Sequence, residues 1–553
     1  MSSEPTRLGV AGAGTMGAGI AQVAAEAGCD VVLYDVSPEI VARALAQIRA
    51  GYDRAVSGGR LTREEADAAL ARIATTTTLN ALGTAQFVIE AAPEDLALKR
   101  QLLAELERVC APDTILASNT SSLSITAIAG GLSRPERVAG MHFFNPVSVR
   151  PLVEVVGGAA TAPEVADAVM ALARRLGKNP MRAADTPGFI VNRIARPFTG
   201  EALRIVGEGL ATPAEVDRIV RGAGFRIGPF EMIDLVGLDV NFAVHRTIYE
   251  QSFGEPRYRP QPLQARLIAA GRLGRKTGQG FYRYEGGRLV AEDAPAPFAD
   301  VAPTGRRGNI LIAGQGPAAD DLALALQAMG QTISTYSTEE SAPLLDAGIP
   351  RARRLRDVLL TTTVAIEATL GPRDLKRAYW YELDESLPPQ IPILALSLGH
   401  GTTELGSWSA RPERVVGFGF VGPFADTPFV ELSRGLRTGD AALRRVVGFV
   451  RGLGKDLAVV GDAPGQILPR LLSCLINEVA FALDEGLAAP DDIDAALRLG
   501  LDFPLGPIAW SARLGLDRVV TTLDGLRDYY GEERYRVAPR LRRSLLAGYE
   551  RLS

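Results

Sequence analysis

Histidine and cysteine are scarce in this chain, with 3 of each in 553 residues. Cys29, Cys110 and Cys474 lie far apart, so neither a disulfide framework nor a metal site is indicated. A net charge of −4 leaves no basic excess for a nucleic-acid partner. No apolar run approaches the roughly 20 residues of a membrane span, and the N-terminal residues lack a signal-peptide core. The sequence predicts a cytoplasmic globular protein with no metal and no membrane attachment.

The length of the chain indicates several domains, because a single hydrophobic core seldom exceeds about 250–300 residues. A segment rich in proline, alanine and glycine, residues 286–307, is typical of a linker. Residues 189–270 carry a helical pattern that follows an α/β pattern. We therefore expect an α/β domain at 1–186 and an all-α domain at 187–285, both before the linker.

A glycine motif stands near the start, between two predicted strands. Gly12, Gly14 and Gly17 follow the apolar run that ends at Ala11, and an alanine-rich helical segment comes next. Gly12 permits a tight turn, Gly14 lets a pyrophosphate approach the backbone, and Gly17 allows close packing of helix on strand. Asp35 ends the second strand, where its carboxylate can bind ribose hydroxyls and repel a 2′-phosphate. This arrangement favours NAD over NADP, although a glycine-rich turn alone could produce the same spacing.

Residues 38–72 predict two amphipathic helices inserted before the next strand. Arg43, Arg49 and Arg54 lie on the first of them. These arginines could contact ligand phosphates or belong to a solvated helix face, and the second interpretation is the more economical for each.

His142 is the residue on which we expect a catalytic function to depend. Glu154 follows twelve residues later, inside an otherwise apolar run, Leu152 to Val156. A carboxylate in such a run is costly to bury unless a partner compensates it. An imidazole titrates near neutral pH, and a neighbouring carboxylate fixes its tautomer. We therefore predict that His142 is a general base and that Glu154 orients it.

Two further polar sites have both a functional and a structural interpretation. Hydroxyl and amide residues at 118–122 follow a predicted strand, where ligands bind in open α/β sheets. The same residues could equally cap the next helix. Asn192 lies one turn into the first long helix of the second domain, either on the face toward the sheet or as a polar residue of the helix surface.

The second half of the chain repeats the first. Residues 134–138, Arg-Pro-Glu-Arg-Val, recur at 411–415, and Glu208-Gly209-Leu210 recurs as Glu485-Gly486-Leu487. Several such matches in the same order indicate a duplication of both domains. We expect a second Rossmann-type domain at 308–460 and a second helical domain at 461–553.

The polar residues of the first half are not repeated with the scaffold. Gly17 corresponds to Ala319, Asp35 to about Ser337, His142 to Gly419 and Asn192 to Pro469, whereas Glu154 is retained as Glu431. His400 lies on a different loop and is interpreted as structural. The second copy should therefore be catalytically inactive.

The motifs of residues 7–284 together resemble the L-3-hydroxyacyl-CoA dehydrogenase family. They are the glycine motif, Ser118 to Ser122, His142 to Val147, Leu152-Val153-Glu154, Pro187 to Arg193 and Lys276-Thr277-Gly278. The duplicated chain is similar to long bacterial members that act in β-oxidation-type catabolism such as phenylacetate breakdown. The resemblance implies oxidation of an acyl-CoA 3-hydroxyl by NAD, with short-chain or dicarboxylic substrates favoured.

Carried over by position, the resemblance implies His142 as base and Glu154 as its partner, with Ser121 and Asn192 at the reacting oxygen. It implies an NAD site that contains Gly12, Gly14, Thr15, Met16, Gly17, Asp35, Glu94, Lys99, Ser121, Asn145 and Lys276. The residues that contact CoA in the family fall on Gly51 and Gly58 here, so those contacts are not carried over.

Three alternatives remain open at this point. A gulonate-type dehydrogenase would share the same polar set, a 6-phosphogluconate-type enzyme would need a catalytic lysine, and a non-catalytic NAD-binding scaffold would resemble the second half. Family members pair through their helical domains, which implies that residues 187–285 pack against 461–553 as an internal pseudo-dimer. A homodimer of the whole chain also remains possible.

Overall fold

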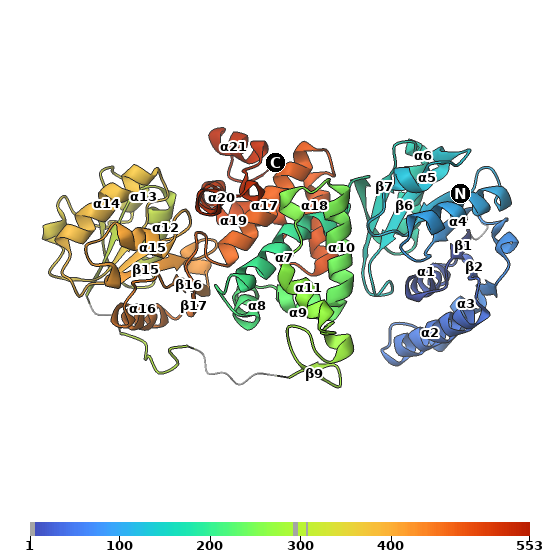
Figure 1. Ribbon diagram of the computed structural model, residues 1–553, viewed down its shortest axis with the longest axis horizontal. Helices are drawn as coiled ribbons and strands as arrows, with labels where there is room; N and C mark the ends of the chain where they lie inside the picture. The colour runs from blue at the N-terminus through green and yellow to red at the C-terminus, as the bar shows by residue number, and fades with distance from the viewer. Residues whose placement is uncertain (1–5, 291–296, 306–307, 553) are drawn as a thin grey trace. The chain divides into compact units, whose positions relative to one another are not determined.

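The computed structural model describes residues 6–290, 297–305 and 308–552 (Figure 1). Residues 1–5, which precede the first strand, and residues 291–296 and 306–307 of the expected linker lie outside the described residues. The chain forms two compact units, Met1–Ile194 with Ala482–Gly506 and Ala195–Phe481 with Pro507–Ser553, here called unit 1 and unit 2. Unit 1 therefore takes in a segment of the second half.

A mainly parallel sheet forms the centre of unit 1. Its strands run in the order β3-β2-β1-β4-β5-β6-β7-β8, and β6 and β7 are antiparallel. The strands are β1 (Arg7–Ala11), β2 (Asp30–Tyr34), β3 (Ile73–Thr76), β4 (Phe87–Glu90), β5 (Ile115–Ser118), β6 (Val138–Phe143), β7 (Leu152–Gly157) and β8 (Asn179–Ala184). The helices are α1 (Thr15–Glu26), α2 (Pro38–Ser57), α3 (Arg63–Ala71), α4 (Leu96–Val109), α5 (Ile125–Ala129) and α6 (Pro163–Arg175).

Strand alternation decides which residues of β6 and β7 enter the hydrophobic core of this sheet. Met141 and Phe143 of β6 and Val153 and Val155 of β7 pack in the core cluster with residues of α1 and α6. Successive side chains of a strand point to opposite faces. The intervening residues of the two strands therefore point to the other face, away from α1 and α6.

Five α-helices of the described residues follow the first sheet, and a connecting segment leads from them to the second sheet. They are α7 (Val191–Gly207), α8 (Pro213–Gly222), α9 (Pro229–Val236), α10 (Leu238–Gln251) and α11 (Pro262–Ala269), with a small hairpin of β9 (Tyr284–Glu285) and β10 (Arg288–Leu289) after them. Thr304 N–H donates to Gly448 O at 2.9 Å, and Arg451 donates to the carbonyls of Phe298 and Val301. The described end of the expected linker therefore packs along the second α/β domain.

The second sheet repeats the first without a counterpart of β3. Its order is β12-β11-β13-β14-β15-β16-β17, again with one antiparallel pair, β15 and β16. The strands are β11 (Asn309–Ala313), β12 (Thr332–Tyr336), β13 (Thr362–Glu367), β14 (Ile393–Leu396), β15 (Val415–Gly419), β16 (Phe429–Ser433) and β17 (Asp456–Val460). The helices are α12 (Pro317–Ala328), α13 (Ala342–Asp346), α14 (Arg373–Ser386), α15 (Thr402–Ser407) and α16 (Asp440–Gly452). A second helical region ends the chain, with α17 (Leu468–Asp484), α18 (Pro490–Leu501), α19 (Pro507–Leu514), α20 (Leu516–Tyr530) and α21 (Pro539–Leu546).

The expected fold class, a Rossmann-type domain followed by a helical domain with the pair duplicated, is confirmed. The two edge strands of the first sheet, β3 and β8, were not expected from the sequence. Asn192 was expected one turn into its helix, but α7 begins at Val191 and Asn192 lies in the first turn. The expected boundaries of the four domains stay predictions, because the compact units group these segments differently. None of the helices in the described ranges is long and apolar enough to span a membrane.

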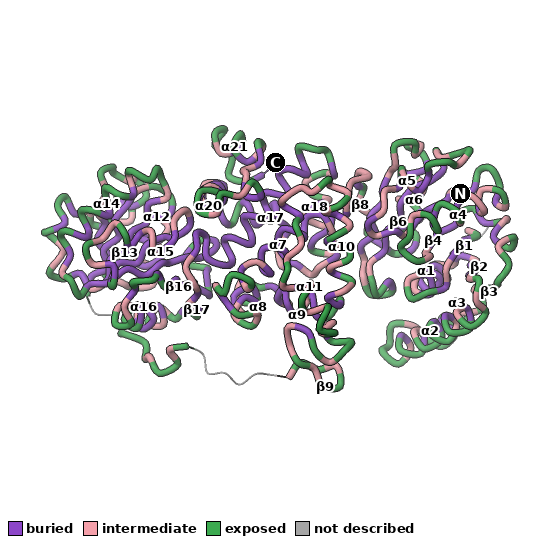
Figure 2. The backbone as a smooth tube through the Cα atoms, viewed as in Figure 1, coloured by how far each residue is buried: buried purple, intermediate pink, exposed green. Residues whose placement is uncertain are grey.

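The two helical regions contact each other inside unit 2 through matched polar pairs. Tyr535 Oη donates to Glu201 at 2.6 Å, and Tyr258 Oη donates to Glu478 at 2.5 Å. Glu201 lies on α7 and Glu478 at the corresponding place on α17, and both helices are largely buried (Figure 2). Arg257 adds a second bond to Glu478 at 2.9 Å. The repeat thus places each tyrosine on the glutamate of the other copy.

Candidate active site

A cavity of about 590 Å³ opens at the carboxyl ends of β1, β2 and β4 in unit 1. It is lined by Gly12, Gly14, Thr15, Met16, Tyr34, Asp35, Val36, Ile40, Arg43, Ala91, Ala92, Pro93, Leu98, Gln101, Leu102 and Glu105. Asp35 is fixed at its edge, because Oδ2 accepts from Ala13 N–H at 2.8 Å and Oδ1 from Ser37 N–H at 3.2 Å. A cavity beside a helix N-terminus with an acid on the next strand has the form of a dinucleotide site.

The glycines of the first loop fit a bound dinucleotide for separate reasons. Gly12 has φ +112°, and a Cβ there would come within 2.6 Å of Ala91 O. A Cβ on Gly17 would collide with Gly12 O, so α1 could not lie so close to β1. A Cβ on Gly14 would meet nothing within 4 Å, so open space lies in front of its backbone. The first two glycines build the loop, and Gly14 leaves room for a ligand.

Glu94 holds the hydroxyl-rich loop that follows β5. Its Oε1 accepts from Thr120 Oγ1 at 2.8 Å, from Ser121 N–H at 2.9 Å and from Ser122 N–H at 3.1 Å. Burial raises the pKa of Glu94, but the ammonium of Lys99 and these donors outweigh burial and hold it below its ordinary value. Glu94 therefore acts as an anion that fixes the shape of the loop.

Lys99 is buried beneath this loop. Its Nζ lies 2.7 Å from Glu90 Oε1 and 3.1 Å from Ala92 O, and only 1% of its side chain is exposed. The second half keeps the same pair as Lys376 with Glu367. Because the pair persists where the glycine motif has degenerated, its first role is to hold the strand end that carries the loop.

His142 and Glu154 are direct neighbours across the antiparallel strands β6 and β7. His142 Nδ1 lies 2.6 Å from Glu154 Oε2, and both side chains are buried. Glu154 Oε1 accepts from the N–H groups of Ile190 at 3.0 Å and Val191 at 2.8 Å, at the start of α7. The carboxylate thus has three partners, which compensates the cost of burying it. The rings of Phe144 and Phe189 lie 4.5 and 6.0 Å from the imidazole.

Ser121 and Asn192 are brought together at the same end of the sheet. Asn192 Nδ2 donates to Ser121 O at 3.2 Å, and Ser121 Oγ lies 3.0 Å from Glu94 Oε1. Asn119 Oδ1 accepts from Phe143 N–H at 2.8 Å, which ties the loop to β6 beside His142. The loop, β6 and the start of α7 are thereby joined by hydrogen bonds.

Two residues of the expected NAD site, Asn145 and Lys276, do not line the cavity at β1, β2 and β4. Asn145 is exposed on the loop after β6. Lys276 belongs to unit 2, where its Nζ pairs with Asp239 at 2.6 Å. Their roles toward NAD stay predictions.

Models of one protein family match both halves of the chain. The description "3-hydroxyacyl-CoA dehydrogenase, NAD binding domain" fits residues 7–186 and 320–463, and "3-hydroxyacyl-CoA dehydrogenase, C-terminal domain" fits 188–284 and 465–551. The chain belongs to the 3-hydroxyacyl-CoA dehydrogenase family. It is an NAD-dependent 3-hydroxyacyl-CoA dehydrogenase, which confirms the expected enzyme class, the cofactor and the acyl-CoA substrate class.

Relatives match the duplicated chain over its whole length or over its first half. A 3-hydroxyadipyl-CoA dehydrogenase of Escherichia coli K12 is 37% identical over 98% of this chain and 98% of its own. A probable 3-hydroxybutyryl-CoA dehydrogenase of Bacillus subtilis is 44% identical over 51% of this chain and 98% of its own. A crystal structure of 3-hydroxybutyryl-CoA dehydrogenase from Escherichia coli K12 covers 98% of this chain and 99% of its own, with 36% identity and a TM-score of 0.77.

In the second half of this dehydrogenase a glutamine side chain occupies the space that corresponds to the His142 imidazole. Gly419 replaces His142, and a Cβ there would collide with Gln466 Oε1, so the Gln466 side chain occupies that space. Glu431 still accepts from the N–H groups of Ile467 at 2.7 Å and Leu468 at 3.0 Å. The glutamate thus holds the start of the following helix in both halves, a structural role that accounts for its retention after the base was lost.

The counterpart of the dinucleotide site in the second half is also filled. Tyr379 Oη lies 2.8 Å from Gln315 Oε1 and from Thr338 N–H, where the first half has its open cavity. His400 packs against Trp408 at 5.2 Å and lies 3.2 Å from Glu404, consistent with a structural residue.

Sequence reasoning missed two residues of the first site. Gln101 and Glu105 line the cavity from α4. Polar residues on one face of a helix that follows a strand end are the only signal that could have indicated them.

Proposed function

We propose that this enzyme oxidises an L-3-hydroxyacyl-CoA to the 3-oxoacyl-CoA, with His142 as general base and Glu154 as its orienting partner. The observation that carries the proposal is the 2.6 Å contact between His142 Nδ1 and Glu154 Oε2. The contact places the Nδ1 proton on the carboxylate side, which leaves Nε2 as the acceptor for the proton of the substrate 3-hydroxyl. As that proton arrives, the carboxylate stabilises the imidazolium.

The residues of the cavity suit NAD as the oxidant. Asp35 would bind the ribose hydroxyls, the backbone at Gly14 and Thr15 would face the pyrophosphate, and Met16 lines the same cavity. NAD bound there supplies the acceptor for the hydride that leaves C3. The fixed carboxylate of Asp35 also disfavours a 2′-phosphate.

Ser121 and Asn192 are proposed to donate to the oxygen that becomes the ketone. Asn192 Nδ2 is held beside the loop by its hydrogen bond to the backbone oxygen of Ser121 at 3.2 Å. The Ser121 hydroxyl donates its proton to Glu94 Oε1 at 3.0 Å, and it would turn from that acceptor to the substrate oxygen. Donors held close to a developing charge stabilise it.

The substrate is proposed to carry a short or a dicarboxylic acyl group. Support comes from the relatives, a 3-hydroxyadipyl-CoA dehydrogenase that matches 98% of this chain and a probable 3-hydroxybutyryl-CoA dehydrogenase that matches its first half. NADH formation with 3-hydroxybutyryl-CoA, a long-chain 3-hydroxyacyl-CoA and 3-hydroxyadipyl-CoA tests the choice. Equal kcat/KM for all three would reject it, and turnover of free gulonate but of no thioester would reject the proposed reaction. The cytoplasmic location stays a prediction.

We also propose that residues 187–285 and 461–553 form an internal pseudo-dimer that replaces the interface of a two-chain enzyme. The reciprocal bonds of Tyr535 to Glu201 and of Tyr258 to Glu478 support it, because a two-fold interface makes each contact twice.

A further inference from the structure

The second half contributes a helix to the sheet of the catalytic half within unit 1. Ala184 N–H at the end of β8 donates to Leu487 O at 2.8 Å. Arg193, buried in the first turn of α7, pairs with Glu485 at 2.7 Å. Beyond these contacts, α18 packs against β7 and β8. The degenerate copy therefore supplies a helix that covers part of these two strands.

Gly500 of α18 lies next to Val191, whose N–H donates to Glu154, and next to Leu152 of β7. A Cβ at Gly500 would come within 2.9 Å of Leu152 Cδ2 and 3.2 Å of Val191 Cγ2. Leu152 lies two residues before Glu154 on the same face of β7, and the N–H of Val191 donates to Glu154 at 2.8 Å. A larger side chain at this position must displace the side chains of Leu152 and Val191, and with increasing size it presses on β7 and the start of α7.

An ion pair between Arg150 and Asp502 attaches the C-terminal end of α18 to the first α/β domain. The guanidinium lies 2.7 Å from the carboxylate. Asp502 follows α18 directly, with φ +56°, so the pair fixes the end of the helix on the loop that precedes β7.

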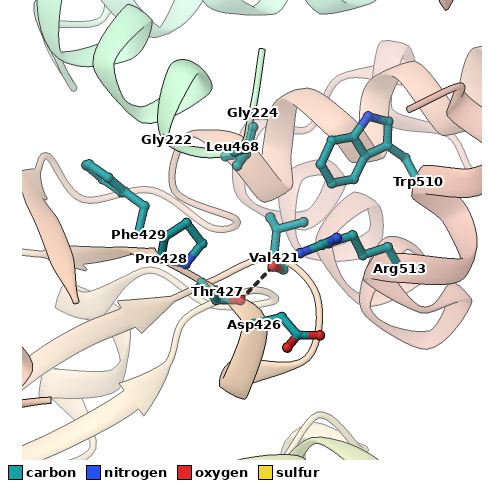
Figure 3. A pocket seen from close by; sticks show the side chains of 11 residues that line it. Gly222, Gly224, Val421, Asp426, Thr427, Pro428, Phe429, Leu468, Trp510 and Arg513 are labelled. Atoms are coloured by element: carbon teal, nitrogen blue, oxygen red, sulfur yellow. Dashed lines mark hydrogen bonds between the residues drawn. The ribbon is translucent and has the colours of Figure 1, made fainter. Parts of the chain in front are cut away.

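In the second copy a helix of the first half packs against the second sheet in the same way, but the residues of the ion pair at its end are replaced. Gly461 N–H donates to Leu210 O at 2.6 Å, and a Cβ on Gly222 would come within 2.7 Å of the Phe429 ring. However, Thr427 and Gly224 stand where the first copy has Arg150 and Asp502. A cavity of about 230 Å³ remains there, lined by Gly222, Gly224, Phe429, Leu468 and Trp510 among others (Figure 3).

We infer that residues 485–502 of the inactive copy are a positioning element for the catalytic pair: α18, through Gly500, sets the distance between β7 and α7 at which Glu154 grips His142. The inference rests on the proposed function of His142. It gives the degenerate half a role that requires neither a base nor a cofactor. It also accounts for the Arg150–Asp502 ion pair, whose residues only the catalytic copy has.

Gly500→Val tests the inference, with Gly222→Val as the matched control at the corresponding place of the second copy. We expect Gly500→Val to lower kcat by about tenfold to a hundredfold, and Gly500→Ala to lower it less, while the Kd for NADH stays within error. Loosening Glu154 also removes stabilisation of the imidazolium, so the acid limb of the kcat–pH profile should shift to lower pH. Gly222→Val should change neither quantity.

Glu485→Gln provides a second variant in case Gly500→Val does not fold, because Glu485 is half exposed and its loss leaves the core intact. Its matched control is Glu208→Gln, since Glu208 faces Arg470 in the second copy at 3.3 Å. Wild-type kcat and an unshifted acid limb in both Gly500→Val and Glu485→Gln would overturn the inference, as would equal losses in the two control variants. Full activity of His142→Gln would instead reject the proposed function itself.

Discussion

His142 and Glu154 face each other across β6 and β7, with Nδ1 2.6 Å from Oε2. The second carboxylate oxygen accepts from the N–H groups of Ile190 and Val191. The carboxylate cannot turn away from the imidazole without breaking these bonds. The strands and the N-terminus of α7 therefore fix the pair together. The two residues are twelve apart in sequence because the end of β6, the connecting loop and the start of β7 lie between them.

Replacing His142 with Gln should remove the base and leave the fold. We expect kcat to fall by roughly 10²–10⁴-fold, the usual contribution of a general base, while the Kd for NADH measured by fluorescence is unchanged. His400→Gln is the control, because His400 packs against Trp408 in the second half and should turn over at the wild-type rate. Near-normal turnover by His142→Gln would refute the assignment.

Local patterns predicted the glycine loop and the contact of His142 with Glu154, for physical reasons. Gly12 and Gly17 are required by backbone geometry that only glycine meets, and an acid in an apolar strand needs a partner wherever it folds. The role of Lys99 was less visible, because its burial against Glu90 depends on the path of the chain after β4. The contact of Gly500 with Val191 could not be read from the sequence at all, since the two residues are brought together by the exchange of helices between copies.

Glu154→Gln should separate the two roles of the glutamate. An amide can still accept from the N–H of Val191, but it cannot stabilise an imidazolium, so kcat should fall by about 10²–10⁴-fold with little loss of folding. Glu431→Gln makes the same change where Gly419 stands in place of the base, and its kcat should equal that of the wild type. Comparable kcat values for Glu154→Gln and the wild type would show that the carboxylate has only a structural role.

Stability should depend on pH through Glu431. Burial raises its pKa to about 8, against the two N–H donors that lower it, from an ordinary value of 4.5. Between these values the carboxyl ionises in the unfolded chain but stays protonated in the folded one. Its contribution to stability is therefore complete below pH 4.5 and is lost as the pH rises through 8.

Melting temperatures of the wild type and Glu431→Gln measured between pH 5 and 9 test this dependence. The advantage of the wild type over the variant should shrink steadily as the pH rises, because glutamine does not titrate. A difference that stays constant over the range would mean that Glu431 is ionised in the folded protein.

Each of the reciprocal tyrosine contacts should stabilise unit 2. Tyr258→Phe and Tyr535→Phe each remove a hydrogen bond to a buried glutamate, a loss of about 1.5–3 kcal/mol in the free energy of unfolding. Tyr529→Phe is the control, because this side chain is 52% exposed. Urea unfolding measures all three. If both variants unfold like the control, the proposed pseudo-dimer interface does not depend on these pairs.

Each chain should bind a single NAD. The first half has an open cavity with Asp35 at its edge, whereas Gln315 and Tyr379 fill the corresponding place in the second. Calorimetric titration with NADH should therefore give a stoichiometry near one, and Asp35→Ala should weaken that one site and reduce its preference over NADPH. In the same titration Gln315→Ala should leave both affinity and stoichiometry unchanged. A second binding event that survives Asp35→Ala would show that the degenerate copy still binds the cofactor, and its side chains would then have to move out of the way.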